Sequence, residues 1–284
     1  MLSTQSPPRD VAIPGTDGMI LRGWHWTRPS PRGVVVIAHG FGEHGGCYRH
    51  VAEALGPALG VEFVAPDLRG HGRSPGRRGV VRKYEDLIDD LRVALDWTAA
   101  ERPDLPRFVL GHSNGGLVAL RLAIAGRADV SGLILSNPSL KIAAHVPGYK
   151  RAIGRVLLRL APGVTLSGKV APDLMTRDPV MQREHRTDPL RHSRISAPLY
   201  FGMVEGGALV AARAGAVRLP ALMLLGGSDP MIDPEATLRF FERLAGPDKA
   251  LRLYPEMRHE PLNELGREQV FADIETWLGP RLGV

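Results

Sequence analysis

The sequence contains a single cysteine, Cys47, among 284 residues, which excludes a disulfide bond within the chain. It also lacks a run of about 18 uncharged apolar residues, the length that a helix needs to cross a bilayer. The first ten residues, MLSTQSPPRD, have neither the basic start nor the apolar stretch of a secretory signal. On these grounds we expect a cytoplasmic protein. Because 44% of the residues are hydrophobic, we also expect a sizeable core.

Acidic residues are the minority among the charged ones, with 30 Asp and Glu against 36 Lys and Arg, a net charge of +6. Such an excess can indicate a nucleic-acid partner. The excess is concentrated in residues 141–200, which hold eleven basic and four acidic side chains. No nucleic-acid-binding motif accompanies them, so we predict no nucleic-acid partner.

Short runs rich in Val, Ile and Leu alternate with longer segments of helical period. This alternation is typical of an α/β fold, in which helices cover both faces of a mostly parallel sheet. Strands are predicted at residues 34–38, 62–65, 108–110, 133–136, 221–225 and 251–254, after an antiparallel pair between residues 11 and 26. Helices are predicted at residues 84–95, 116–125 and 270–278, where apolar side chains recur every three or four positions.

The alternation stops after Pro138. The following segment is basic, has helical periods and contains six prolines between residues 147 and 198. An insertion after the carboxyl end of a strand lies on the side where open α/β sheets bind ligands. We therefore predict a core made of residues 1–138 and 203–284, with an inserted helical cap at residues 139–202.

A GxSxG motif, Gly111-His112-Ser113-Asn114-Gly115, follows the strand at residues 108–110 and precedes a helix. A serine on such a sharp turn needs small neighbours two positions before and after it. This context favours Ser113 as a catalytic nucleophile. A serine hydroxyl is weakly nucleophilic at neutral pH, so a base must take its proton and an acid must orient that base.

Asp229 and His259 each follow a predicted strand, in the chain order Ser, acid, His that this motif demands. Because the carboxyl ends of parallel strands meet at one edge of a sheet, the three side chains are expected to converge. Asp233 is an alternative acid, although it lies farther from the strand end and next to Pro234.

Two backbone amides are expected to form an oxyanion hole. One belongs to Asn114, at the amino end of the helix after Ser113. The other is predicted in the loop after the strand at residues 34–38, where Phe41 is the candidate.

Three blocks of the sequence resemble the monoacylglycerol lipase and lysophospholipase group of serine hydrolases, in the α/β-hydrolase superfamily. They are HGFGEH at residues 39–44, DLRGHGRS at residues 67–74 and GHSNGG at residues 111–116. In the cap, TRD at residues 176–178 and DPL at residues 188–190 are also similar to this group. The resemblance implies an α/β-hydrolase fold, a monoglyceride or lysophospholipid substrate, no cofactor, and catalytic roles for Ser113, Asp229 and His259.

Two residues depart from this group. Asn114 stands where Met is usual, and Phe41 where a smaller residue is usual. The preferred acyl chain length therefore does not follow from the resemblance, and short-chain carboxylesters or thioesters remain alternative substrates. A hydrolase-like binding protein without activity is an alternative of another class.

Other motifs suggest different chemistry. Gly40, Gly42 and Gly45 form GxGxxG after a strand, and Asp67 follows at a spacing that suits a dinucleotide-binding oxidoreductase. That hypothesis leaves the GxSxG motif unexplained. The histidines near Glu43 and beside Glu260 approach zinc motifs but miss the required spacing, so no metal site is predicted.

The predicted cap contains a basic amphipathic helix. Arg151, Arg155 and Arg159 recur every four residues, and the opposite face carries the apolar residues Ile153, Val156, Leu157 and Leu160. Such a helix either packs its apolar face on the core or rests on an anionic membrane surface. Membrane contact is therefore a hypothesis, and the oligomeric state is not predicted.

Overall fold

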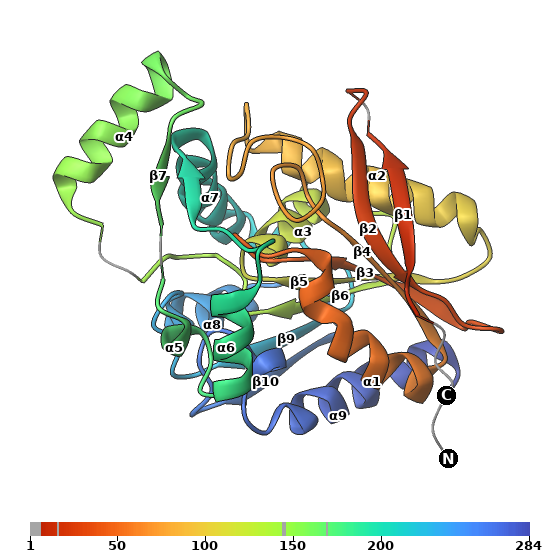
Figure 1. Ribbon diagram of the computed structural model, residues 1–284. Coiled ribbons are helices and arrows are strands. Elements are labelled where there is room, and N and C mark those ends of the chain that lie inside the picture. Colours follow the sequence, from red (N-terminus) through yellow and green to blue (C-terminus); the bar gives the residue numbers. More distant parts are fainter. Residues whose placement is uncertain (1–6, 16, 144–145, 169) are drawn as a thin grey trace.

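The computed structural model describes residues 7–15, 17–143, 146–168 and 170–284 (Figure 1). In these residues, eight strands form one sheet in the order β1-β2-β4-β3-β5-β6-β9-β10. β2 pairs antiparallel with β1 and β4, and the other neighbours pair in parallel. The strands are β1 (Arg9–Pro14), β2 (Ile20–Trp26), β3 (Gly33–Ala38), β4 (Val61–Pro66), β5 (Arg107–His112), β6 (Gly132–Ser136), β9 (Ala221–Gly226) and β10 (Lys249–Tyr254).

The central strands are apolar along their whole length because both faces of the sheet are covered. In β3, Val34 and Val36 belong to one core, whereas Val35 and Ile37 belong to the core on the opposite face. All four side chains are fully buried. A parallel strand buried on both faces needs a continuous apolar run instead of an alternating pattern.

Six helices supply the two layers over the sheet. Those whose residues join the first core are α2 (Glu85–Glu101), α3 (Asn114–Ile124), α7 (Ala197–Ala212) and α8 (Pro234–Glu242). Those that cover the opposite face are α1 (Arg49–Leu59) and α9 (Arg267–Leu278) (Figure 1). Short 3-10 helices are η1 (Gly45–Tyr48), η2 (Ala214–Ala216), η3 (Pro261–Asn263) and η4 (Gly279–Leu282).

The region between β6 and α7 holds the remaining helices and a second, two-stranded sheet. They are α4 (Gly148–Leu160), α5 (Pro172–Met175), α6 (Pro179–Thr187) and the antiparallel pair β7 (Thr165–Ser167) and β8 (Arg194–Ser196). None of the described residues in 139–202 belongs to a strand of the large sheet. Helix α7 runs across residue 202, and residues 144–145 and 169 lie outside the described part of the chain. The division into core and cap stays a prediction.

The carboxyl ends of four neighbouring parallel strands lead into the segments that carry the candidate site. β5 leads into Ser113, β6 into Asn137, and β9 and β10 into the loops of Asp229 and His259. The parallel register of these strands brings the four segments to one edge of the sheet. Among the described helices, none combines the length and the hydrophobicity that a membrane span requires.

Candidate active site

Ser113 occupies the turn between β5 and α3 with φ 50° and ψ −118°, an unusual backbone conformation for a residue with a side chain. The glycines around it are required by space. A Cβ on Gly115 would lie 1.9 Å from the carbonyl oxygen of Ala38, and one on Gly111 would lie 2.7 Å from the Cα of Gly116. The tight turn therefore holds the Ser113 hydroxyl at the sheet edge, as the motif predicts.

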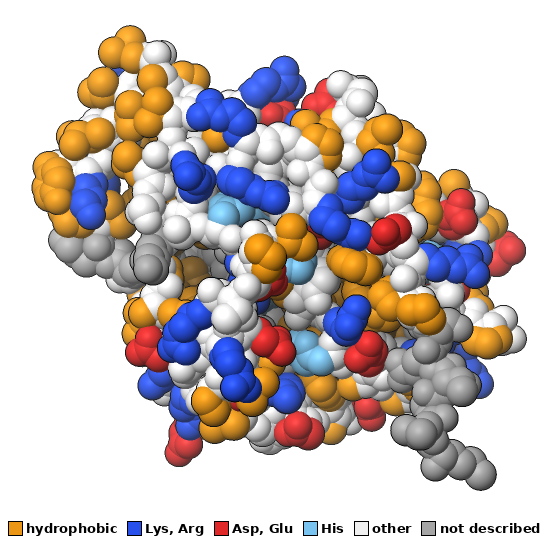
Figure 2. Space-filling model, viewed as in Figure 1, with side chains coloured by type: hydrophobic (Ala, Val, Ile, Leu, Met, Phe, Trp, Pro, Cys, Tyr) orange, Lys and Arg blue, Asp and Glu red, His pale blue; other side chains and the backbone are white. Residues whose placement is uncertain are grey.

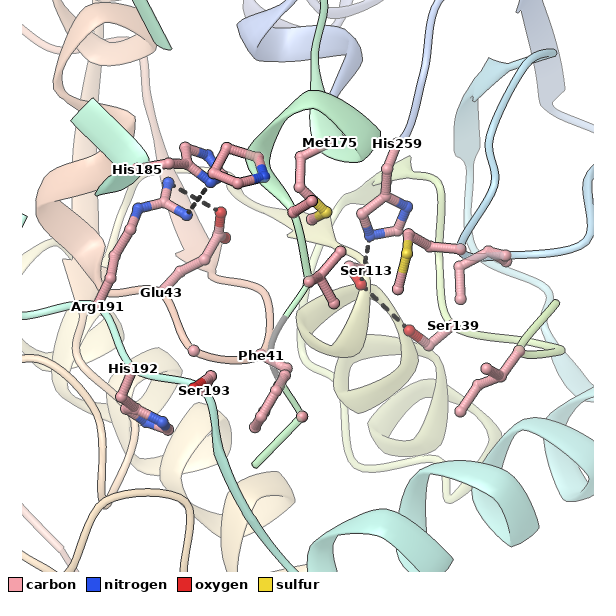
Figure 3. A pocket seen from close by; sticks show the side chains of 18 of the residues that line it. Phe41, Glu43, Ser113, Ser139, Met175, His185, Arg191, His192, Ser193 and His259 are labelled. Carbon is pink, nitrogen blue, oxygen red and sulfur yellow. Dashed lines mark hydrogen bonds and ion pairs between the residues drawn. The ribbon is translucent and has the colours of Figure 1, made fainter. Parts of the chain in front are cut away.

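The three side chains that the sequence nominates lie in contact. The Ser113 hydroxyl is 2.9 Å from Nε2 of His259 (Figure 3). On the other side of the ring, Nδ1 of His259 is 2.8 Å from Oδ2 of Asp229. All three residues are buried. Asp233, the alternative acid, instead caps the amino end of α8 and pairs with Lys141 at 2.7 Å. Its carboxylate is therefore engaged elsewhere.

The electrostatic surroundings of Asp229 and His259 favour an ionised carboxylate beside the imidazole. Burial raises the pKa of the Asp229 carboxyl, but His259 and the amides of Met231 and Ile232 outweigh burial and hold that pKa below its usual value. Burial lowers the pKa of the His259 imidazole, but the Asp229 charge and the hydrogen bond donated to it raise that pKa overall. An ionised Asp229 keeps the proton of a neutral His259 on Nδ1, which leaves Nε2 free to accept from Ser113.

The two predicted oxyanion amides belong to Asn114, which follows Ser113 in the chain, and to Phe41, which lines the same cavity as Ser113. Asn114 is the first residue of α3, so its amide has no acceptor within the helix. Phe41 follows β3 and, like Ser113, lines a cavity at the carboxyl edge of the sheet (Figure 3). The carboxylate of Glu43 accepts a hydrogen bond from the Gly40 amide at 2.8 Å and so stabilises the loop that carries Phe41. The use of these amides as an oxyanion hole stays a prediction.

A cavity of about 630 Å³ opens beside Ser113 and His259, between the core and the segment of residues 168–193. Its apolar lining includes Ile142, Met175, Met203, Met231 and Ile232. Its polar lining includes Glu43, His185, Asp188, Arg191 and His192. Figure 3 shows Glu43, His185 and Arg191 together on one side of Ser113, and Ser139 and His259 on the other. The cavity therefore suits a ligand with a polar end and an apolar end.

Sequence reasoning missed a polar network formed by two buried residues, Glu43 and Glu260, and two half-buried ones, His185 and Arg191. Arg191 lies 3.3 Å from Glu43 and donates to Nδ1 of His185 at 3.2 Å, while Nε2 of His185 lies 2.9 Å from Glu260. The network joins the loop after β3, the residue after His259 and the segment of α6 and Arg191. The signals present in the sequence were Glu43 inside HGFGEH and Glu260 beside His259, but nothing marked Arg191.

This network and a second cluster close to it contain possible metal ligands. Among the residues that the structure describes, two groups have donor atoms close enough for a cation: Glu43, His185 and Glu260, and His44, Cys47 and Asp188. In the first group Arg191 already supplies the positive charge, and in the second the His44 ring lies 2.6 Å from Asp188. We therefore assign neither group to a metal.

The Asp67 side chain, which follows the glycine-rich loop in the sequence, has a structural role in this protein. The Asp67 carboxylate accepts hydrogen bonds from the amides of Gly45 and Arg73, each at 2.7 Å. A dinucleotide fold would use this carboxylate for a ribose hydroxyl. Here it connects two loops, so the geometry does not favour the oxidoreductase hypothesis.

Comparisons with known proteins agree with this geometry. The sequence matches the Hydrolase_4 family, described as Serine aminopeptidase, S33, over residues 29–266. A monoacylglycerol lipase of Mycolicibacterium smegmatis is 35% identical over 89% of this chain and 90% of its own length. Phospholipase YtpA of Bacillus subtilis is 31% identical over 87% of this chain and 95% of its own length.

A solved structure supports the same relationship. The monoacylglycerol lipase of Paleococcus ferrophilus superimposes with a TM-score of 0.82 at 32% identity, covering 92% of this chain and 98% of that protein. This similarity confirms the α/β-hydrolase fold predicted from the sequence. The chain therefore belongs to the Hydrolase_4 family and is a serine ester hydrolase.

Proposed function

We propose that the protein hydrolyses the ester bond of monoacylglycerols and related single-chain lipids through an acyl-enzyme on Ser113. The observation that carries this proposal is the hydrogen-bonded series from Asp229 through His259 to Ser113, at the wall of a cavity lined by both polar and apolar side chains. The names of the similar lipases and phospholipase support the same substrate class.

The geometry supports a two-step acyl transfer. His259 takes the Ser113 proton through Nε2 as Oγ attacks the ester carbonyl, and Asp229 stabilises the resulting imidazolium. The amides of Phe41 and Asn114 donate to the oxyanion. His259 then protonates the departing alcohol, and a water molecule that His259 deprotonates releases the fatty acid.

The two sides of the cavity suggest how the substrate is oriented. The polar network can hydrogen-bond a hydroxylated alcohol or a headgroup. On the other side, an adjoining cavity of about 530 Å³ shares Ser139, Ile142 and Met203 with the first and adds Leu140 and Val204. We infer that the acyl chain extends into this second cavity, because apolar walls favour burial of methylene groups.

A substrate panel tests the proposal. Monoacylglycerols of increasing chain length, a lysophospholipid, a short p-nitrophenyl ester and a thioester are compared by kcat/KM. We expect a long-chain monoacylglycerol to exceed the short ester, and Ser113→Ala to abolish turnover and fluorophosphonate labelling while the circular dichroism spectrum stays unchanged. Turnover retained by Ser113→Ala, or absent labelling of the wild type, contradicts the acyl-enzyme.

We also propose that residues 139–202 act as a cap that contacts an anionic lipid surface through α4. The apolar side chains of this helix do not pack on the core: Ile153, Val156 and Leu160 are 48%, 56% and 81% exposed. Figure 2 shows hydrophobic side chains gathered over the α4 region at the upper left of the molecule. The exposed cations Arg151, Arg155 and Arg159 lie on the same helix.

Vesicle sedimentation tests this contact. Each cation near an anionic surface contributes about 1 kcal/mol, which is about fivefold in partitioning. We expect vesicles that contain phosphatidylglycerol to bind more protein than phosphatidylcholine alone, and Arg155→Gln to weaken that binding about fivefold. Arg239→Gln on α8 is the matched control, since Arg239 is also exposed. Equal binding to both kinds of vesicle contradicts the proposal. The cytoplasmic location expected from the sequence stays a prediction.

A further inference from the structure

Asn137 has an unusual backbone conformation next to the active site. It follows β6 directly, is fully buried and has a φ of +39°. Among the described residues other than glycine, Ser113 and Asn137 are the two with positive φ. Asparagine tolerates this left-handed region better than most residues, and such conformations cluster at functional sites.

The side-chain amide of Asn137 contacts both partners of Ser113. Nδ2 donates to Oδ2 of Asp229 at 2.8 Å and to the carbonyl oxygen of His259 at 3.1 Å, and it lies 3.3 Å from the carbonyl oxygen of Arg258. Oδ1 accepts from the amide of Gly226 at 2.8 Å. One side chain therefore connects the end of β9, the Asp229 carboxylate and the His259 backbone.

The contacts of Asp229 show what the amide adds. Oδ1 accepts from the amides of Met231 and Ile232, at 2.7 and 3.1 Å. Oδ2 accepts from Nδ1 of His259 and from Asn137. With donors on both oxygens the carboxylate cannot rotate without losing hydrogen bonds, so its direction toward the imidazole is held from several sides.

We propose that Asn137 is a positioning residue for the reaction: it fixes the Asp229 carboxylate and the His259 loop relative to each other, and thereby aims Nε2 at Ser113. This inference rests on the proposed function, because it assigns Asn137 a role in that chemistry. Aspartate would match the shape but bring a second negative charge beside Asp229. Glycine would accept the positive φ but supply no donor.

Two substitutions at this position separate positioning from a purely structural role. Asn137→Gly relieves the backbone conformation and removes the amide. We expect kcat for a monoacylglycerol to fall about 100-fold, the scale of a misaligned catalytic group, with KM changed less than threefold. Asn137→Asp keeps the shape and adds charge. We expect the acid limb of its kcat/KM profile to move to higher pH, since a second carboxylate favours the imidazolium form of His259.

The readouts distinguish failure of this proposal from failure of the proposed function. Fluorophosphonate labelling of the wild type reports the activated serine without any change at Asn137. If the wild type labels and both folded variants keep its kcat and its acid limb, the positioning role is wrong and the acyl-enzyme stands. If Asn137→Gly does not fold, as judged by circular dichroism, the pH profile of the isosteric Asn137→Asp decides: an unmoved acid limb overturns the proposal.

Discussion

Replacing Arg191 by methionine tests whether the polar network depends on its cation. Arg191 lies between α6 and β8, and its guanidinium lies 3.3 Å from Glu43 and 4.0 Å from Glu260. Both glutamates are buried, with 3% and 1% of their surface exposed. Methionine keeps much of the volume of the side chain but leaves the two carboxylates without this positive charge.

The expected loss in the free energy of unfolding follows from the burial of the two carboxylates. Removing one partner of a buried ion pair costs about 3–5 kcal/mol, because the remaining charge stays in a poorly solvating environment. Glu43 and Glu260 keep other donors, such as the Tyr48 hydroxyl at 2.8 Å and the Asn263 amide at 2.7 Å. We therefore expect the free energy of unfolding at pH 7.5 to fall by about 3 kcal/mol, the lower end of that range.

The sign of the pH dependence is part of the test. Burial raises the pKa of Glu43, but the charge of Arg191 and other partners outweigh burial and hold it below 4.5. In the wild type, the stabilisation that comes from ionised Glu43 is therefore fully present above the pKa that Glu43 has in the unfolded protein. It is lost as the pH falls through the lower pKa of Glu43 in the folded protein. Without Arg191, burial dominates and the pKa of Glu43 rises above its unfolded value. The loss of stability caused by Arg191→Met then grows as the pH rises, and it shrinks as the pH falls toward the usual pKa of a glutamate.

Urea unfolding of wild type and Arg191→Met at pH 5 and pH 7.5 measures both quantities. Arg239→Met is the control, because Arg239 and its partner Glu235 form an exposed pair at 3.3 Å. We expect this control to change stability by less than about 1 kcal/mol. A loss of less than 1 kcal/mol for Arg191→Met, or an equal loss at both pH values, would refute the assigned role of Arg191.

Three further predictions concern the site itself. The acid limb of kcat/KM is expected above pH 6.5, because the pKa of His259 is raised and only its neutral form accepts the Ser113 proton; a pH-rate profile measures it. Asp229→Asn is expected to lower kcat by about 10⁴-fold, since an amide no longer holds the proton on Nδ1; steady-state kinetics with unchanged thermal unfolding checks this. Gly115→Ala is expected to lose about 3 kcal/mol of stability by overpacking against Ala38, whereas Gly148→Ala, with open space around its Cβ, is expected to lose none; urea unfolding compares the two.

The sheet and the converging side chains were predictable because local patterns determine them. The strand at residues 108–110 and the glycines around Ser113 specify a strand-to-helix turn with little choice of conformation. Parallel pairing then brings Asp229 and His259 to the same edge, so chain order and strand ends were sufficient to nominate them. The structure places their side chains within hydrogen-bonding distance of each other and of Ser113.

The polar network and Asn137 were not predictable from such patterns. Arg191 and Glu43 are far apart in the sequence, and neither has a spacing that marks the other as its partner. Asn137 follows an apolar strand as many turn residues do, so its positive φ and its amide contacts emerge only when β9 pairs with β6 and β10 pairs with β9. Helical periodicity described α4 as amphipathic, but periodicity cannot tell a packed apolar face from an exposed one.

The cap contacts indicate which part of this region can move for substrate access. Residues after α5 are tied to the core: Thr176 donates to the carbonyl oxygen of Asn263 at 2.8 Å, Asp178 pairs with Arg267 at 2.7 Å, and Asp188 lies 2.6 Å from His44. If Arg191 moved with these residues, the buried carboxylates of Glu43 and Glu260 would lose the positive charge beside them. In α4, by contrast, Gly154 is the one buried residue among those described, and it contacts the Phe201 ring of α7. We therefore expect motion in this region to cost least at α4, and the segment from Thr176 to Arg191 to keep its contacts with the core.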